Sequence, residues 1–132
     1  VVAKENAMAL GLSGRAQFKQ GDWCEGLDGK FDIILSNPPY IPSGVIPTLD
    51  PEVSVFEPVL ALDGGEDGFS CYRKILKSLS RVLAKDGFAA FEFGMGQQST
   101  LKNLAVENGF EVVGIKNDLS GLPRTIIIKN KN

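Results

Sequence analysis

The 132-residue sequence contains no histidine, which excludes the Ser/His/Asp and Cys/His arrangements of nucleophilic catalysis from this chain. Its two cysteines, Cys24 and Cys71, lie far apart and form no C-x-x-C pair. We therefore expect reduced thiols rather than a disulfide framework or a zinc site, and no metal. No apolar run is long enough to span a bilayer, and no signal-peptide pattern opens the chain. These absences favour a cytoplasmic protein.

Positive charge forms no cluster, because the lysines and arginines are scattered along the chain, and the formal net charge is -2. A nucleic-acid-binding protein usually carries a clustered basic surface, so DNA or RNA is disfavoured as the direct substrate without being excluded. Apolar residues make up 43% of the chain and charged residues 23%, which is ordinary for one globular domain.

The apolar residues that are present predict an alternation of helices and strands. Helical spacing occurs over residues 3–10, 68–84 and 97–108, and strand-like runs occur at 16–20, 31–36, 88–93, 110–116 and 125–129. The last two runs are separated by a short, glycine- and proline-containing segment, so we expect them to be antiparallel neighbours. This order predicts a three-layer α/β sheet, parallel except for one reversed strand. Residues 37–66 form a long connection, and such connections are usually functional.

The most informative segment is Asn37-Pro38-Pro39-Tyr40, which directly follows the apolar run 31–36. In open α/β sheets the ligand lies beyond the carboxyl ends of the strands. Asn37 offers a carboxamide oxygen, the two prolines leave a stiff backbone rich in carbonyl acceptors, and Tyr40 adds a flat face. We infer a receptor for a planar group carrying an NH₂, such as a carboxamide or a nucleobase amino group. Fixing both hydrogens would aim the nitrogen lone pair at an electrophile. The plainer interpretation is a proline-rich turn.

Several further segments can be read together with this one. They are Gly21-Asp22-Trp23, Ile41-Pro42, Phe56-Glu57-Pro58, the run from Leu62 to Gly68, and the run from Asp118 to Arg124. In combination they resemble the HemK/PrmC family, S-adenosylmethionine-dependent methyltransferases that modify the glutamine of the Gly-Gly-Gln motif in peptide-chain release factors. The resemblance extends from Val1 to about Lys129. The Asn-Pro-Pro-Tyr segment alone is shared with enzymes that methylate amino groups of DNA and RNA.

The resemblance implies roles for individual residues. Asn37 to Tyr40 would bind the glutamine amide, with Asn37, Pro38 and Tyr40 as catalytic residues and Asn37 also next to the methyl donor. Trp23 would line the adenine end of the S-adenosyl-L-methionine pocket, and Asp22 would hydrogen-bond the adenine or a neighbouring group. Both lie where a ligand is expected, after a strand-like run. Without a ligand, Trp23 would be a packing residue and Asp22 a turn residue.

The family also has parts that this sequence lacks, namely a glycine-rich cofactor loop after its first strand, an acidic ribose-binding residue and an amino-terminal helical domain. We therefore expect residues 1–132 to be the C-terminal portion of a methyltransferase catalytic domain, a Rossmann-like sheet without its first strands. Such a chain should bind S-adenosylmethionine weakly or not at all, be inactive alone, and dimerise through exposed sheet edges.

The function that follows is methylation of a glutamine amide in a release factor. Two alternatives stay open at this point: a DNA or rRNA exocyclic-amino methyltransferase, and a non-catalytic module that docks a peptide.

Overall fold

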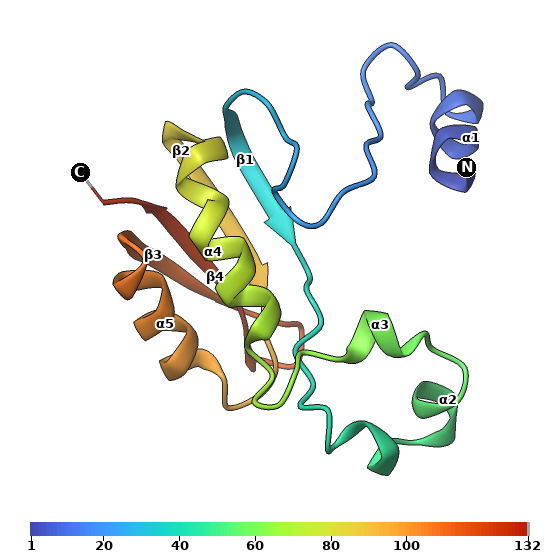
Figure 1. Ribbon diagram of the computed structural model, residues 1–132, viewed down its shortest axis with the longest axis vertical. Coiled ribbons are helices and arrows are strands. Elements are labelled where there is room, and N and C mark those ends of the chain that lie inside the picture. Colours follow the sequence, from blue (N-terminus) through green and yellow to red (C-terminus); the bar gives the residue numbers. More distant parts are fainter. Residues whose placement is uncertain (132) are drawn as a thin grey trace.

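The computed structural model describes residues 1–131, which form a four-stranded mixed sheet with two long helices against one face (Figure 1). The elements in chain order are α1 (Val2–Ala9), β1 (Phe31–Ser36), the 3-10 helix η1 (Ile46–Thr48), α2 (Pro51–Ser54), α3 (Val59–Leu62), α4 (Ser70–Val82), β2 (Leu83–Glu92), α5 (Gln98–Glu107), β3 (Phe110–Asn117) and β4 (Pro123–Asn130). The strand order is β1-β2-β4-β3, with β1 and β2 parallel and β4 antiparallel to both of its neighbours. The single reversed strand confirms the predicted sheet.

The core lies between this sheet and helices α4 and α5. Helix α4 buries the side chains that recur at helical spacing in the sequence, which are Tyr72, Ile75, Leu76, Leu79 and Val82. They pack in one cluster with alternate residues of β2 and β4 and with Leu101 and Ala105 of α5. Full burial of one large apolar side chain contributes roughly 1.5–3 kcal/mol. This cluster therefore fixes the sheet under α4.

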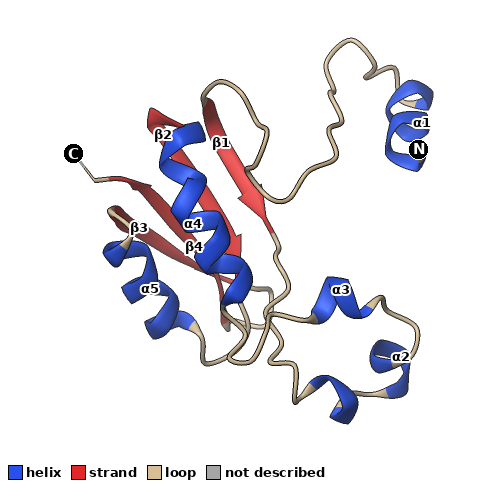
Figure 2. Ribbon diagram, viewed as in Figure 1, coloured by secondary structure: helices blue, strands red, loops and turns tan. Residues whose placement is uncertain are grey.

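Two expectations about the architecture are wrong. Residues 16–20 form no strand, because a strand is held by hydrogen bonds to a neighbour and no described strand pairs with this segment. The three-layer arrangement is also not observed over residues 1–131. Helices α4 and α5 contact each other on the same face of the sheet, and α1 stands away from it (Figure 2).

The opposite face of the sheet, which we call the outer face, carries exposed apolar side chains. Ile33 and Leu35 of β1 are 56% and 73% exposed, and Val113 of β3 is 46% exposed.

None of the helices within residues 1–131 is long and apolar enough to cross a membrane.

Strand β2 begins five positions before the expected start at residue 88, because the segment expected to close helix α4 is itself part of the strand. Phe31 pairs with Leu83, and after an irregularity Ile33 pairs with Phe88. Gly87 lies in this irregular stretch, where an added Cβ would stand 2.8 Å from the Asp32 carbonyl oxygen. The close approach of the two backbones therefore requires glycine.

The segment from Asp118 to Arg124 contains the turn between β3 and β4 and the first two residues of β4. The Asp118 carboxylate accepts hydrogen bonds from the backbone N–H groups of Ser120 and Leu122 and from the Arg124 guanidinium. These bonds hold the pKa of Asp118 below its usual value. This part of the family resemblance is explained by a structural turn.

Candidate functional site

The Asn37-Pro38-Pro39-Tyr40 segment leaves the carboxyl end of β1, as the sequence predicts. Pro38 is fully buried, Pro39 and Tyr40 are partly buried, and Asn37 is exposed. The Tyr40 hydroxyl donates a hydrogen bond to Oε1 of Glu92 at 3.3 Å, at the end of the neighbouring strand β2. Burial, followed by the Glu92 carboxylate, raises the pKa of Tyr40. The hydroxyl therefore stays protonated and serves as an anchor rather than a base.

Gln97, just before α5, fixes the backbone of this segment from the other side. Its Nε2 donates to the Tyr40 carbonyl oxygen at 2.8 Å, and its Oε1 accepts the Gly94 N–H at 2.9 Å. A Cβ at Gly94 would lie 2.9 Å from the Tyr40 ring, so the turn after β2 can approach the ring only as glycine. Gln97 was not predicted, because nothing in its local sequence distinguishes it from its neighbour Gln98.

The run from Leu62 to Gly68 lies against the same segment and pairs with it like a short strand. Ile41 and Asp63 form a parallel bridge, with the Ile41 N–H bound to the Leu62 carbonyl at 3.1 Å and the Gly64 N–H to the Ile41 carbonyl at 2.8 Å. The Asp63 carboxylate accepts the Ser43 hydroxyl at 2.6 Å and the Gly65 N–H at 2.8 Å. These hydrogen bonds lower the pKa of Asp63. Two segments far apart in the sequence are thus fastened together.

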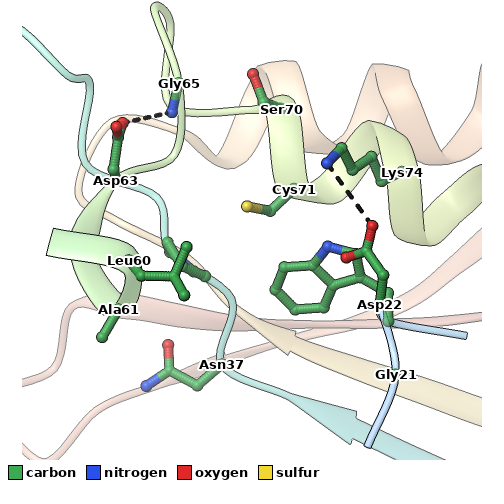
Figure 3. A pocket seen from close by; sticks show the side chains of 12 residues that line it. Gly21, Asp22, Asn37, Leu60, Ala61, Asp63, Gly65, Ser70, Cys71 and Lys74 are labelled. Carbon is green, nitrogen blue, oxygen red and sulfur yellow. Dashed lines mark hydrogen bonds and ion pairs between the residues drawn. The ribbon is translucent and has the colours of Figure 1, made fainter. Parts of the chain in front are cut away.

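A hollow of about 570 Å³ opens beside these two hydrogen-bonded segments (Figure 3). Four of the predicted residues, Asp22, Trp23, Asn37 and Pro39, line it together. Further lining residues come from α3 and the start of α4, including Leu60, Ala61, Ser70, Cys71 and Lys74. The structure therefore brings the Asp22-Trp23 turn and the Asn37 segment to one cavity, although 13 residues separate Trp23 from Asn37 and no described strand precedes the turn.

The loop that carries Asp22 and Trp23 is held by helix α4. Arg81 donates to the carbonyls of Leu27 at 2.7 Å and Cys24 at 2.6 Å, and the Cys24 side chain is buried in the core. Trp23 adopts a left-handed backbone with φ 54, a conformation that is uncommon for a bulky residue. Asp22 faces Lys74, with Oδ2 and Nζ 3.9 Å apart. Within residues 1–131 the Asp22 carboxylate makes no hydrogen bond to the backbone, but its carbonyl accepts the Glu25 N–H at 3.0 Å, so Asp22 does begin a turn.

A smaller hollow of about 170 Å³ also borders the segment and is lined by Asn37, Pro38, Pro39, Tyr40, Ile41, Ala61 and Leu62. Asn37 and Pro39 thus border both hollows, whereas Pro38 and Tyr40 border only the smaller one. A planar amide in the smaller hollow and a second ligand in the larger one would meet at Asn37.

The cysteines are both free, as expected from their spacing. Cys71 lies in the wall of the larger hollow, and burial raises the pKa of its thiol. A raised pKa disfavours the thiolate, so Cys71 is no activated nucleophile. No group of three or more potential metal ligands comes together within residues 1–131.

Known structures define the class of fold. The ribosomal protein L11 methylase of Lactobacillus delbrueckii subsp. bulgaricus matches 98% of this chain and 51% of its own chain, with a TM-score of 0.66 and 19% sequence identity. The sheet with its two helices is therefore part of a Rossmann-like methyltransferase fold, as expected from the sequence.

Sequence relatives are more specific. A release factor glutamine methyltransferase of Rhodospirillum rubrum is 46% identical over 130 residues, which is 98% of this chain and 40% of that protein. One of Caulobacter vibrioides is 45% identical over 131 residues, 98% of this chain and 45% of that protein. By sequence, the chain is thus a relative of the release factor glutamine methyltransferases, which confirms the family resemblance. It spans less than half the length of these curated relatives. No family model matches the chain.

Proposed function

We propose that the intact protein carrying this chain methylates the side-chain amide nitrogen of a glutamine in the Gly-Gly-Gln motif of a peptide-chain release factor. The observation that carries this proposal is the position of Asn37, which borders both the larger and the smaller hollow. The sequence relatives, both named release factor glutamine methyltransferases, support the same substrate.

The larger hollow suits S-adenosyl-L-methionine as the cofactor. Its volume of about 570 Å³ falls within the usual range for small-molecule sites, and it offers the Trp23 indole for stacking and the Asp22 carboxylate as an acceptor for an amino or hydroxyl group. When bound, this cofactor supplies an electrophilic methyl group. Trp23, Asp22 and Asn37 would hold it. Because this chain is expected to lack the glycine-rich loop, we expect calorimetry to show weak or no binding by residues 1–132 alone.

The smaller hollow suits the substrate amide. The Asn37 carboxamide oxygen and the Pro38 carbonyl would accept its two N–H hydrogens, Pro39 would keep the backbone stiff, and the Tyr40 ring would pack on the amide plane. Held in this way, the nitrogen points its lone pair toward the larger hollow. The Asn37 and Pro38 acceptors would thus hold the nitrogen toward the methyl group that the cofactor would supply, and the methylated amide nitrogen would release its extra proton to water. Orientation of this kind contributes roughly 7–11 kcal/mol in favourable cases, so no histidine is needed.

A nucleic-acid amino group is the second candidate substrate, because it would fit the same acceptors. The charge of the stretch of sequence that contains the Asn37 segment argues against it. Between Lys30 and Arg73 the sequence has seven acidic residues and no lysine or arginine. A polyanion approaching the site would be repelled rather than attracted.

Replacement of Asn37 tests the proposal. In the intact protein, we expect Asn37→Ala to lower the rate of methyl transfer to a release factor by about 100-fold or more, as for loss of one fixed polar group that acts on the reacting atoms. The matched control is Asn103→Ala, an exposed asparagine on α5. Rates follow from transfer of radiolabelled methyl groups, with DNA and ribosomal RNA as competing substrates. An undiminished rate in Asn37→Ala contradicts the proposal, and release-factor binding without methyl transfer by the unaltered protein would instead indicate a docking module.

A further inference from the structure

The connection that runs from η1 into α3 leaves large apolar side chains uncovered beside the site. Val55, Phe56, Val59 and Leu60 are 71%, 80%, 56% and 89% exposed. They follow one another along the chain around the start of α3, and Leu60 also lines the larger hollow (Figure 3). An apolar surface that continues into a ligand cavity is typical of a contact site rather than of ordinary solvent-facing surface.

The same connection is acidic and carries no compensating positive charge. Asp50, Glu52 and Glu57 are all exposed, and within residues 1–131 none of them takes part in an ion pair. Lys30 and Arg73, the basic residues nearest in sequence, lie outside it. The connection therefore combines unpartnered apolar side chains with unpaired carboxylates, and its complement is a segment that carries apolar and basic side chains.

We propose that residues 45–60, here called the docking segment, bind the polypeptide that flanks the target glutamine, and that this polypeptide presents lysine or arginine next to apolar residues. This inference rests on the proposed function. Small hollows of the observed size can select an amide but not one protein among many, so a wider contact is needed for specificity. The docking segment supplies such a contact. Helix α3 connects it to the run from Leu62 to Gly68, and hydrogen bonds hold that run against the residues that follow Tyr40.

Two sets of substitutions in the intact protein separate the apolar and the charged contributions. The first is Phe56→Ser, and the second is the double change Glu52→Lys with Glu57→Lys. None of the substituted residues lines either hollow. The matched controls are Leu119→Ser, an exposed leucine in the β3–β4 turn, and Glu107→Lys with Glu111→Lys, two exposed acids at the α5–β3 connection.

The assay compares a purified bacterial release factor with a capped Gly-Gly-Gln tripeptide that has no flanking residues. With the release factor, we expect each docking variant to raise KM about tenfold while kcat stays the same, as for loss of an interface anchor or of complementary charge. With the tripeptide, kcat/KM should not change. Added salt should raise KM for the unaltered protein and have less effect on the charge-reversed variant. The controls should match the unaltered protein throughout.

Unchanged KM values for the release factor in both docking variants would overturn the proposal and leave the proposed function intact. A lower Tm of the intact Phe56→Ser protein would also overturn it, because Phe56 would then pack against another part of the protein. Loss of a dimer in that variant would do the same, with a second copy as the occupant. If the unaltered protein methylates neither substrate, the proposed function fails by itself. The docking segment is then tested by fluorescence anisotropy with labelled release factor, where binding must weaken in Phe56→Ser.

Discussion

Glycine at position 68 allows the chain to turn underneath the Tyr40 carbonyl. Its φ is +81, and an added Cβ would lie 2.5 Å from the Tyr40 oxygen and 2.7 Å from Nε2 of Gln97. We expect Gly68→Ala to lower the free energy of unfolding by about 2–4 kcal/mol, from left-handed strain together with overpacking. Gly121→Ala is the control, since Gly121 has φ +84 and open space around it, and its loss should be about 1 kcal/mol. Urea denaturation measures both, and equal losses would contradict the packing argument.

Asp67 supplies a pH-dependent contact next to this glycine. Its carboxylate accepts Nη1 and Nη2 of Arg73 at 3.0 and 2.5 Å and the Phe69 N–H at 3.0 Å, and these bonds lower its pKa to about 2. A lowered pKa gives stability that is present above the unfolded value of about 4 and lost as the pH falls through about 2. The pair is nearly half exposed, so the contribution is below about 1 kcal/mol.

We therefore expect Asp67→Asn to destabilise the protein slightly at neutral pH, and the difference from the unaltered protein to shrink below pH 4 and to vanish only below about pH 2. Urea denaturation over this pH range measures it. Glu66→Gln is the matched control, because Glu66 forms no ion pair within residues 1–131. A difference that persists at the lowest pH would show that Asp67 acts through packing instead of charge.

Single residues could be predicted from the sequence where their chemistry is unusual in its context. Asn37 stands out because a polar side chain follows an apolar run and precedes two prolines. Trp23 was singled out by the family resemblance and by its position after the run 16–20, which forms no strand, yet it lines the larger hollow with Asn37. Gln97 and Arg81 could not be predicted. Their partners are backbone carbonyls distant in the sequence, and carbonyl positions depend on the fold rather than on residue type.

At the scale of elements, Gln97 connects the start of α5 to the Asn37 to Tyr40 segment through its side-chain hydrogen bonds. Removal of its side chain leaves the Tyr40 carbonyl and the Gly94 N–H without partners, which costs about 1–3 kcal/mol for a buried group. In the intact protein, we also expect slower methyl transfer, by about tenfold or more, because small displacements of positioning groups are costly.

The measurements are urea denaturation and the methyl-transfer rate for Gln97→Ala, Gln97→Glu and the neighbouring control Gln98→Ala. Gln97→Glu keeps an acceptor for the Gly94 N–H but loses the donor to Tyr40, so it should slow methyl transfer as Gln97→Ala does. If Gln97→Glu were fully active, the bond to the Tyr40 carbonyl would be unnecessary for positioning.

Elements that pack against a partner in the chain were mostly predictable, and helix α1 was predicted from its own residue spacing although it stands away from the sheet. The apolar spacing in α4 and α5 finds a sheet to cover, and the β3–β4 pair needs only a short connection. Residues 16–20 have the composition of a strand, but none of the four described strands pairs with them. The start of β2 was misplaced because Lys85-Asp86-Gly87 has the composition of a turn, whereas the irregular pairing with β1 admits these residues into the strand.

At the scale of the whole molecule, the outer face and the free edge of β1 predict self-association of the 132-residue chain. Leu35 and Ile33 lie on this face, and β1 is an edge strand whose second side is unpaired among the described residues. We expect sedimentation velocity to show a dimer or larger species and Leu35→Lys to shift the chain toward monomer. Leu119→Lys, at an exposed turn position, should not. A chain that stays monomeric at high micromolar concentration would contradict this prediction.

Helix α4 contributes to the larger hollow twice, directly through Ser70, Cys71 and Lys74 and indirectly through the Arg81 bonds to the loop that bears Trp23. A single helix anchored in the core therefore positions two walls of this cavity. Such a cavity is already formed before a ligand binds. The conformational entropy of ordering its walls is therefore lost during folding and not during binding.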